Sequence, residues 1–234
     1  MNAQIFDISA YTVIIIMIGL LLWYKSYFLD EFGQTPRSVI EALRGPLEDR
    51  RVTISRLRSK VEYPASFMLV AASNPCPCGF YGEGDRCTCT PSQRQAYLGR
   101  LSGPILDRID LHVWMHPVPS DRVMGARPAE TSADVAARVL KARIIQKQRF
   151  ATEAIHTNSE MSNKQIEKYC PLSEPCRAMM EKLLSGMDLS MRAFYRIIKV
   201  ARTIADLEGS DDIRPQHLAE AAGYRFLDKQ NIGK

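Results

Sequence analysis

The hydrophobic pattern of this chain changes once, between Trp114 and Ser132, and the change limits the folds that the chain can adopt. Before Trp114 the apolar residues form short runs that end at glycine, proline or polar residues, a pattern typical of strands joined by turns and helices. After Ser132 the apolar residues recur every three or four positions, which is typical of amphipathic helices. The sequence therefore predicts an α/β part followed by an all-helical part.

This outline divides the chain into regions of different character. We expect an apolar leader at 1–26, the α/β part at 27–118, a linker rich in proline, serine and glycine at 119–131, and the helical part at 132–234. The α/β part is predicted to contain strands at 27–29, 67–72 and 111–114 and a hairpin over 51–63. The predicted helices of the helical part are 132–150, 162–169, 173–185, 190–208 and 215–227.

The composition is that of a globular protein with a substantial core. The chain has 234 residues, of which 46% are hydrophobic and 24% are charged, and these values exclude collagen-like, low-complexity and wholly disordered chains. Lysine and arginine number 31 against 26 aspartate and glutamate residues, which gives a formal net charge of +5. This small basic excess permits a nucleic-acid partner but does not require one.

The apolar leader contains no charged residue from Ile8 to Tyr24. Its length lies at the lower limit for a membrane-spanning helix, roughly 17–25 residues. A secretory signal is disfavoured because the preceding segment carries Asp7 and no lysine or arginine. Three interpretations stay open for residues 8–24: a short membrane anchor, a buried strand or helix, and a non-native extension. With the first, the protein would be membrane-associated.

Two adjacent carboxylates, Asp30 and Glu31, follow the apolar strand predicted at 27–29. In nucleotide hydrolases such a Walker B pair holds the magnesium ion and polarises the attacking water. Asn74 ends the next predicted apolar strand, at 67–72, and would lie beside the pair if the two strands were parallel neighbours. The alternative for the acidic pair is a solvated strand-to-helix turn.

Two arginines complete the candidate catalytic set. Arg108 lies at a turn before the strand predicted at 111–114, where its guanidinium would reach the γ-phosphate of a neighbouring subunit. Arg192 lies just inside a predicted helix of the helical part and is suited to sensing bound nucleotide.

Four of the six cysteines are clustered in the loop that follows Asn74. They form two Cys-x-Cys pairs, Cys76 with Cys78 and Cys87 with Cys89, and four thiolates in a short loop suit structural Zn²⁺. Reduced free thiols or a disulfide are the alternatives. The clustering indicates a reducing compartment, so we expect a cytoplasmic protein. Cys170 and Cys176 are expected to be ordinary buried residues.

The predicted hairpin carries basic residues near its tip. Arg56, Arg58 and Lys60 occupy alternating positions and therefore share one face of the hairpin. That face could contact the phosphate backbone of DNA without reading bases. A solvated basic turn is the alternative.

Longer stretches of the chain resemble one family, the Mg-chelatase-like AAA+ proteins of the ComM type. The similar stretches are YFLDEFGQTPRSVIEALRGPLEDRRVTISR at 27–56, AASNPCPC at 71–78, GRLSGPILDRIDLH at 99–112 and LSMRAFYRIIKVARTIADLEG at 189–209. The resemblance implies a partial AAA+ sheet from the Walker B strand onward, followed by a helical lid domain.

The resemblance also implies residue roles and partners. Asp30 and Glu31 would be Walker B, Asn74 sensor 1, Arg108 the arginine finger and Arg192 sensor 2, with ATP and Mg²⁺ as cofactors. The family role is that of a homo-hexameric, ATP-driven DNA motor that promotes branch migration during natural transformation and recombination.

The chain departs from the family in one respect: it contains no Gly-x-x-x-x-Gly-Lys-Ser/Thr phosphate loop. That loop supplies the backbone N–H groups and the lysine that hold the β- and γ-phosphates. We therefore expect a truncated module with little or no ATPase activity alone. The alternative is a catalytically inactive DNA-binding or ring-assembly module, which residues 8–24 would tether to a membrane.

Overall fold

The computed structural model describes residues 26–56, 59–101, 103–115, 118, 130–187, 189–225 and 227. The predictions for the apolar leader and for most of the linker concern residues outside this part. Among the described residues, no helix combines the length and the hydropathy needed to cross a bilayer. The chain forms two compact units, one reaching Ile109 and the other starting at Asp110.

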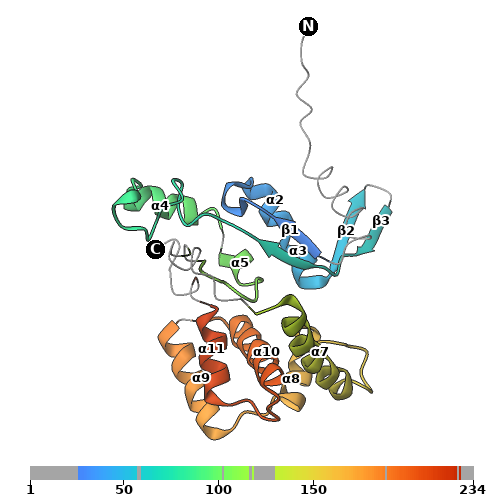
Figure 1. Cartoon of the computed structure of the whole chain (residues 1–234). Coiled ribbons are helices and arrows are strands. Elements are labelled where there is room, and N and C mark those ends of the chain that lie inside the picture. Colours follow the sequence, from blue (N-terminus) through green and yellow to red (C-terminus); the bar gives the residue numbers. More distant parts are fainter. Residues whose placement is uncertain are drawn as a thin grey trace. The chain divides into compact units, whose positions relative to one another are not determined.

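A pair of parallel strands lies at the centre of the first unit (Figure 1). Strand β1 (Ser26–Leu29) pairs with β4 (Met68–Ala71), and Leu29 lies opposite Ala71. Parallel neighbours need a crossover connection. The crossover here contains two short helices and a hairpin: α2 (Arg37–Ala42), α3 (Arg44–Asp49), β2 (Arg51–Arg56) and β3 (Ser59–Pro64).

The hairpin follows directly from the sequence pattern. Strands β2 and β3 are antiparallel, with Ile54 opposite Val61 and Val52 opposite Tyr63. β-branched and aromatic residues in such cross-strand pairs stabilise a two-stranded ribbon. Arg50, in the left-handed region at φ 54°, ends α3 and turns the chain into β2.

After β4 the chain makes a long loop and then two helices. The 3-10 turn η2 (Gly84–Arg86) lies in the loop, and α4 (Pro91–Leu98) follows it. Thr90 caps α4 in a reciprocal capping box with Gln93, and Pro91 occupies the first turn. Helix α5 (Gly103–Leu106) contributes Ile105 and Leu106 to the buried residues of this unit.

The regular secondary structure described in the second unit is all helical, as predicted. Its helices are α7 (Ser132–Arg149), α8 (Asn163–Tyr169), α9 (Glu174–Met187), α10 (Met191–Glu208) and α11 (Pro215–Gly223), with the 3-10 turn η3 (Asn158–Glu160) before α8. Helix α10 contacts α7, α8, η3 and α11. Its buried face, which includes Ile197 and Ala201, packs against Leu218 and Met180 in one hydrophobic core.

A buried carboxylate, Asp206 of α10, ties the helical unit together. Its side chain has no solvent exposure and accepts hydrogen bonds from Arg149 of α7, Arg202 of α10 and Asn158 of η3. Gln146 of α7 donates a further hydrogen bond over 3.3 Å. A buried charge is tolerated only when it is paired and hydrogen bonded, and here both conditions are met.

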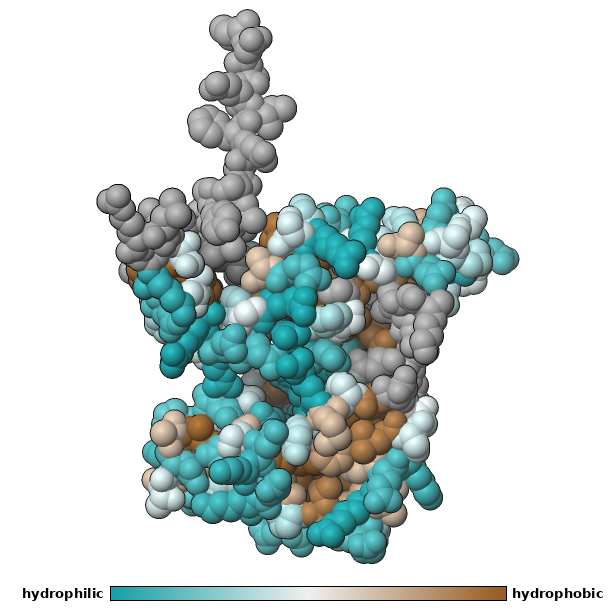
Figure 2. Space-filling view, turned by 180° about the vertical axis from the view of Figure 1, so that it is seen from behind, coloured by the Kyte–Doolittle hydropathy of each residue, from teal (hydrophilic) through white to brown (hydrophobic). Residues whose placement is uncertain are grey.

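Both units leave apolar side chains uncovered among the described residues. On the face seen in Figure 2, hydrophobic residues gather on the helical unit. On the parallel strands, Phe28 is 64% exposed and Met68 is 62% exposed. Parallel strands are normally covered on both faces, so this sheet presents surface suited to burial against further structure.

One predicted element is wrong. The sequence predicts a third strand at 111–114, but residues 111–115 form no strand in the structure. The His112 N–H donates instead to the Tyr224 carbonyl over 2.7 Å, and Leu111 and Val113 are exposed. A β-type sequence becomes a strand only beside a partner edge, and this segment has none among the described residues.

Replacing Asp206 by alanine is expected to destabilise the helical unit by about 3–5 kcal/mol, because Arg149 and Arg202 would remain buried without their carboxylate. Urea unfolding followed by far-UV circular dichroism measures this change. The control is Asp212→Ala, an exposed position that should change stability by less than about 0.5 kcal/mol. Equal effects of the two substitutions would contradict the role given to Asp206.

Candidate functional site

The end of β1 carries the acidic pair in an unusual backbone conformation. Glu31 has φ 51° and ψ 40°, in the left-handed region, and the Asp30 Oδ1 atom accepts a hydrogen bond from the Glu31 N–H at 2.8 Å. Both side chains are exposed. A left-handed residue other than glycine costs roughly 1–3 kcal/mol, and such strain is concentrated at functional sites. The acidic pair therefore lies at a position where local backbone preference is overridden.

Asn74 lies at the same edge of the sheet as the acidic pair. The Ala72 N–H donates to the Leu29 carbonyl at 2.9 Å, and the Phe32 N–H donates to the Ala72 carbonyl at 2.8 Å. These two bonds extend the parallel pairing to Leu29 and Phe32, the residues on either side of the acidic pair. In open α/β sheets, ligands bind at the carboxyl ends of the strands, and this edge exposes Asp30, Glu31 and Asn74 together.

Arg108 is held inside its own unit. Its Nε lies 2.9 Å from the Glu48 carboxylate of α3, and its Nη1 donates to the Pro104 carbonyl at 2.6 Å. Only 11% of its side chain is exposed. To reach another subunit, as its predicted role requires, the guanidinium would have to leave Glu48.

Arg192 belongs to the helical unit. It is the second residue of α10 and is exposed. Ser190 caps this helix by accepting from the Ala193 N–H at 3.1 Å. Within the α/β unit, the structure thus places Asp30, Glu31 and Asn74 on one sheet edge.

Of the predicted basic hairpin residues, Lys60 is the one whose side chain the structure describes. The side chain of Arg56 and all of Arg58 lie outside the described part. The Lys60 ammonium is 3.4 Å from one carboxylate oxygen of Glu62, and the Arg51 Nη1 atom is 3.4 Å from the other. These pairs are exposed, so they compete weakly with an external phosphate.

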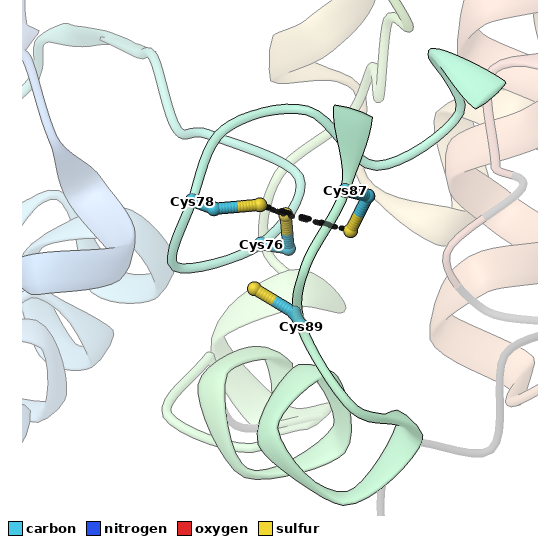
Figure 3. A group of neighbouring side chains, drawn as sticks. All are labelled: Cys76, Cys78, Cys87 and Cys89. Carbon is cyan, nitrogen blue, oxygen red and sulfur yellow. Dashed lines mark hydrogen bonds between the residues drawn. The ribbon is translucent and has the colours of Figure 1, made fainter. Parts of the chain in front are cut away.

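The four loop cysteines converge, as Figure 3 shows. Their sulfur atoms all lie within 4.8 Å of one another. Cys76 is 3.3 Å from Cys78 and 3.8 Å from Cys87, while Cys78 and Cys87 are 3.7 Å apart. Four sulfurs bound tetrahedrally at a Zn–S distance of about 2.3 Å are separated by about 3.8 Å. The cluster therefore has dimensions that could hold a metal ion.

The loop is shaped to make this convergence possible. Gly79, Gly82 and Gly84 all have positive φ, a conformation that glycine adopts without strain. The Phe80 backbone N–H lowers the pKa of Cys78 to about 6, while burial raises the pKa of Cys89 to about 11. A thiolate is the form that binds metal, so Cys78 is prepared to be a ligand at neutral pH.

The remaining cysteines behave as predicted. Cys170 and Cys176 are buried in the core of the helical unit, and the Cys176 thiol donates to the Ile213 carbonyl at 3.3 Å. All six cysteines are free.

Three residues that the sequence did not single out, Gly33, Ser73 and Tyr97, pack together at the turn that follows the acidic pair. Gly33 and Phe32, both buried, follow Glu31 in the 3-10 turn η1 (Phe32–Gln34). The Tyr97 hydroxyl and the Ser73 hydroxyl approach Gly33 so closely that a Cβ there would lie 2.5 and 2.7 Å from them. Local sequence patterns do not indicate this contact, because Tyr97 and Gly33 are far apart in the chain.

Comparison with known proteins agrees with this arrangement. Residues 25–123 match the family described as magnesium chelatase, subunit ChlI, and residues 129–225 match the ChlI C-terminal family. The competence protein ComM of Haemophilus influenzae is 45% identical over 201 residues, which cover 86% of this chain and 38% of that protein. YifB of Salmonella typhimurium and YifB of Escherichia coli are each 43% identical over 204 residues, which cover 86% of this chain and 39% of each relative.

The chain thus spans well under half the length of these relatives. Its mixed α/β unit with a small parallel sheet, followed by a helical unit, agrees with part of an AAA+ fold of the magnesium-chelatase type. From the two family matches and from its similarity to these relatives, the chain belongs to the magnesium-chelatase-like AAA+ family that includes ComM and YifB.

Proposed function

We propose that this chain is the carboxylate-bearing and lid part of a ComM-like AAA+ motor that moves DNA branches at the expense of ATP. The observation that carries the proposal is the common sheet edge of Asp30, Glu31 and Asn74. In this proposal Asp30 holds the Mg²⁺ of bound ATP, Glu31 polarises the attacking water and Asn74 orients that water.

In this proposal Arg108 and Arg192 contribute to the nucleotide site once the chains have assembled into a ring. Arg108 serves a neighbouring subunit of a homo-hexameric ring after leaving Glu48, and Arg192 contacts the nucleotide from the helical unit. The uncovered apolar side chains of both units support association with other chains. Arg56, Arg58 and Lys60 contact the DNA backbone from the hairpin.

By itself the chain is proposed to be inactive, because its sequence holds no phosphate loop to fix the β- and γ-phosphates. This absence favours a second candidate function for the isolated chain, that of a ring-assembly or DNA-binding module without hydrolysis. Tethering of such a module to a membrane by residues 8–24 stays a prediction that concerns residues outside the described part.

We propose further that Cys76, Cys78, Cys87 and Cys89 hold Zn²⁺ as thiolates. The donor chemistry and the sulfur separations support this ligand set. When bound, Zn²⁺ would act structurally, closing the loop between β4 and α4.

The catalytic assignment is tested with Glu31→Gln. The chain alone should show no DNA-stimulated ATP turnover. Turnover should appear when a phosphate-loop segment of the Haemophilus influenzae relative is added, and Glu31→Gln should reduce it by about 10²–10⁴-fold, because the water loses its base. The control is Asp49→Asn, an exposed position at the end of α3. Undiminished turnover in Glu31→Gln would refute the assignment, and Glu31-dependent turnover by the chain alone would refute its inactivity.

The hairpin assignment is tested by replacing Arg56, Arg58 and Lys60 with glutamine. Binding to duplex DNA, measured by fluorescence anisotropy at several salt concentrations, should weaken equally for unrelated sequences. The slope of log K against log salt should fall by about one for each DNA phosphate that the variant no longer neutralises. The charge-matched control replaces Lys141, Lys147 and Lys164, all exposed in the helical unit. An equal decrease in affinity for both triple variants would show a general charge effect instead.

Zinc binding is tested by metal analysis combined with thiol titration under non-denaturing conditions. We expect one zinc per chain, and Cys78→Ser or Cys89→Ser should lose most of it, because three ligands do not close a structural site. Cys170→Ala, outside the cluster, should retain zinc. Metal-free protein with four freely reactive loop thiols would contradict the site.

A further inference from the structure

The cysteine loop and the acidic pair are connected through the fold at both ends of the loop. Ser73 and Asn74 leave β4 just before Cys76, so the first ligand lies close to the sheet edge in the chain. At the other end Cys89 directly precedes Thr90, the N-cap of α4. The loop therefore joins the end of β4 to the start of α4, with the four sulfurs between them.

Arg94 of helix α4 contacts the cysteine loop. The Arg94 Nη1 donates to the Cys89 carbonyl at 2.7 Å, and the Arg94 guanidinium lies over the Tyr81 ring, 4.8 Å from its centroid. The first half of α4 thus contacts the cysteine loop at two points, the Cys89 carbonyl and the Tyr81 ring.

Tyr97, near the C-terminal end of α4, reaches the turn that follows the acidic pair. It is buried, and its hydroxyl lies 3.4 Å from the Ser73 Oγ. These two hydroxyls leave Gly33 no room for a Cβ. Gly33 belongs to η1, in which the Gln34 N–H donates to the Glu31 carbonyl at 2.8 Å. A displacement of Tyr97 would therefore release the turn that holds Glu31 in its left-handed conformation.

We propose that Tyr97 is a positioning residue that couples metal binding at the four cysteines to the geometry of Asp30 and Glu31. In this proposal the metal fixes the conformation of the loop, and the loop fixes the position of α4. Tyr97 of α4 then packs against Gly33. This inference rests on the proposed zinc site and on the proposed role of the acidic pair. Its consequence is that loss of the metal loosens the acidic turn without any change in its own residues.

The test is amide hydrogen exchange at 32–35 in the full chain, with zinc bound and after removal by a chelator. Removal should accelerate exchange at these amides by about tenfold or more, a size typical of coupling between two sites. Exchange in β2 and α2, which belong to the same unit, should change little. Acceleration spread evenly over the unit would mean general unfolding and would overturn the coupling.

Variants at Tyr97 and Gly33 separate positioning from folding. Tyr97→Leu should give fast exchange at 32–35 even with zinc bound, so that removing the zinc accelerates exchange no further. Tyr97→Phe retains the ring and should therefore retain part of the coupling. The control Tyr63→Leu, on the exposed hairpin, should retain the full effect. Gly33→Ala should accelerate exchange at 32–35 as zinc loss does. Exchange at these amides should be slower in the double variant Gly33→Ala/Tyr97→Leu than in Gly33→Ala alone.

Metal analysis of the same samples distinguishes the possible failures. If no zinc is bound, the proposed zinc site fails, and the coupling fails with it. If zinc is bound and its removal leaves exchange at 32–35 unchanged, the coupling alone is wrong, and the roles proposed for the zinc site and the acidic pair stand.

Discussion

The parallel pairing of β1 with β4 is the constraint on which the α/β unit depends. Because both strands run in the same direction, their carboxyl ends meet at one edge, and the residues after each strand become neighbours. The bonds between Leu29, Ala72 and Phe32 carry this pairing beyond the strands. An antiparallel pair would have put Asn74 at the end opposite Asp30. The topology thus decides which polar side chains can share a ligand.

The two units are stabilised in different ways. In the helical unit, α10 combines an apolar face with the buried carboxylate of Asp206, so the same helix supplies both the core and its polar centre. The α/β unit has fewer buried apolar residues and leaves Phe28 and Met68 exposed. There, the cysteine loop and the contact of Tyr97 with Gly33 supply local order that a two-stranded sheet alone would lack.

Features encoded by neighbouring residues could be predicted from the sequence. Of the contacts between distant segments, the sequence raised only the parallel neighbourhood of the strands at 27–29 and 67–72, as the condition for Asn74 to lie beside Asp30. The helices of the second unit follow from local periodicity and from caps such as Ser190, and the cysteine cluster follows from spacing within one loop. The expected strand at 111–114 failed because strand formation needs a partner edge. The pairing of Arg108 with Glu48 and the approach of Tyr97 to Gly33 join distant segments, so no local pattern indicates them.

The central claim is that Asp30, Glu31 and Asn74 form one magnesium–nucleotide site at the carboxyl edge of β1 and β4. Paramagnetic broadening by Mn²⁺, used in place of Mg²⁺ with ATP and an added phosphate-loop segment, tests it most directly. The account predicts that the amide signals of residues 30–32, 73 and 74 broaden together and that Asp30→Asn abolishes the broadening at both strand ends. Broadening confined to one strand end, or unchanged in Asp30→Asn, would contradict it.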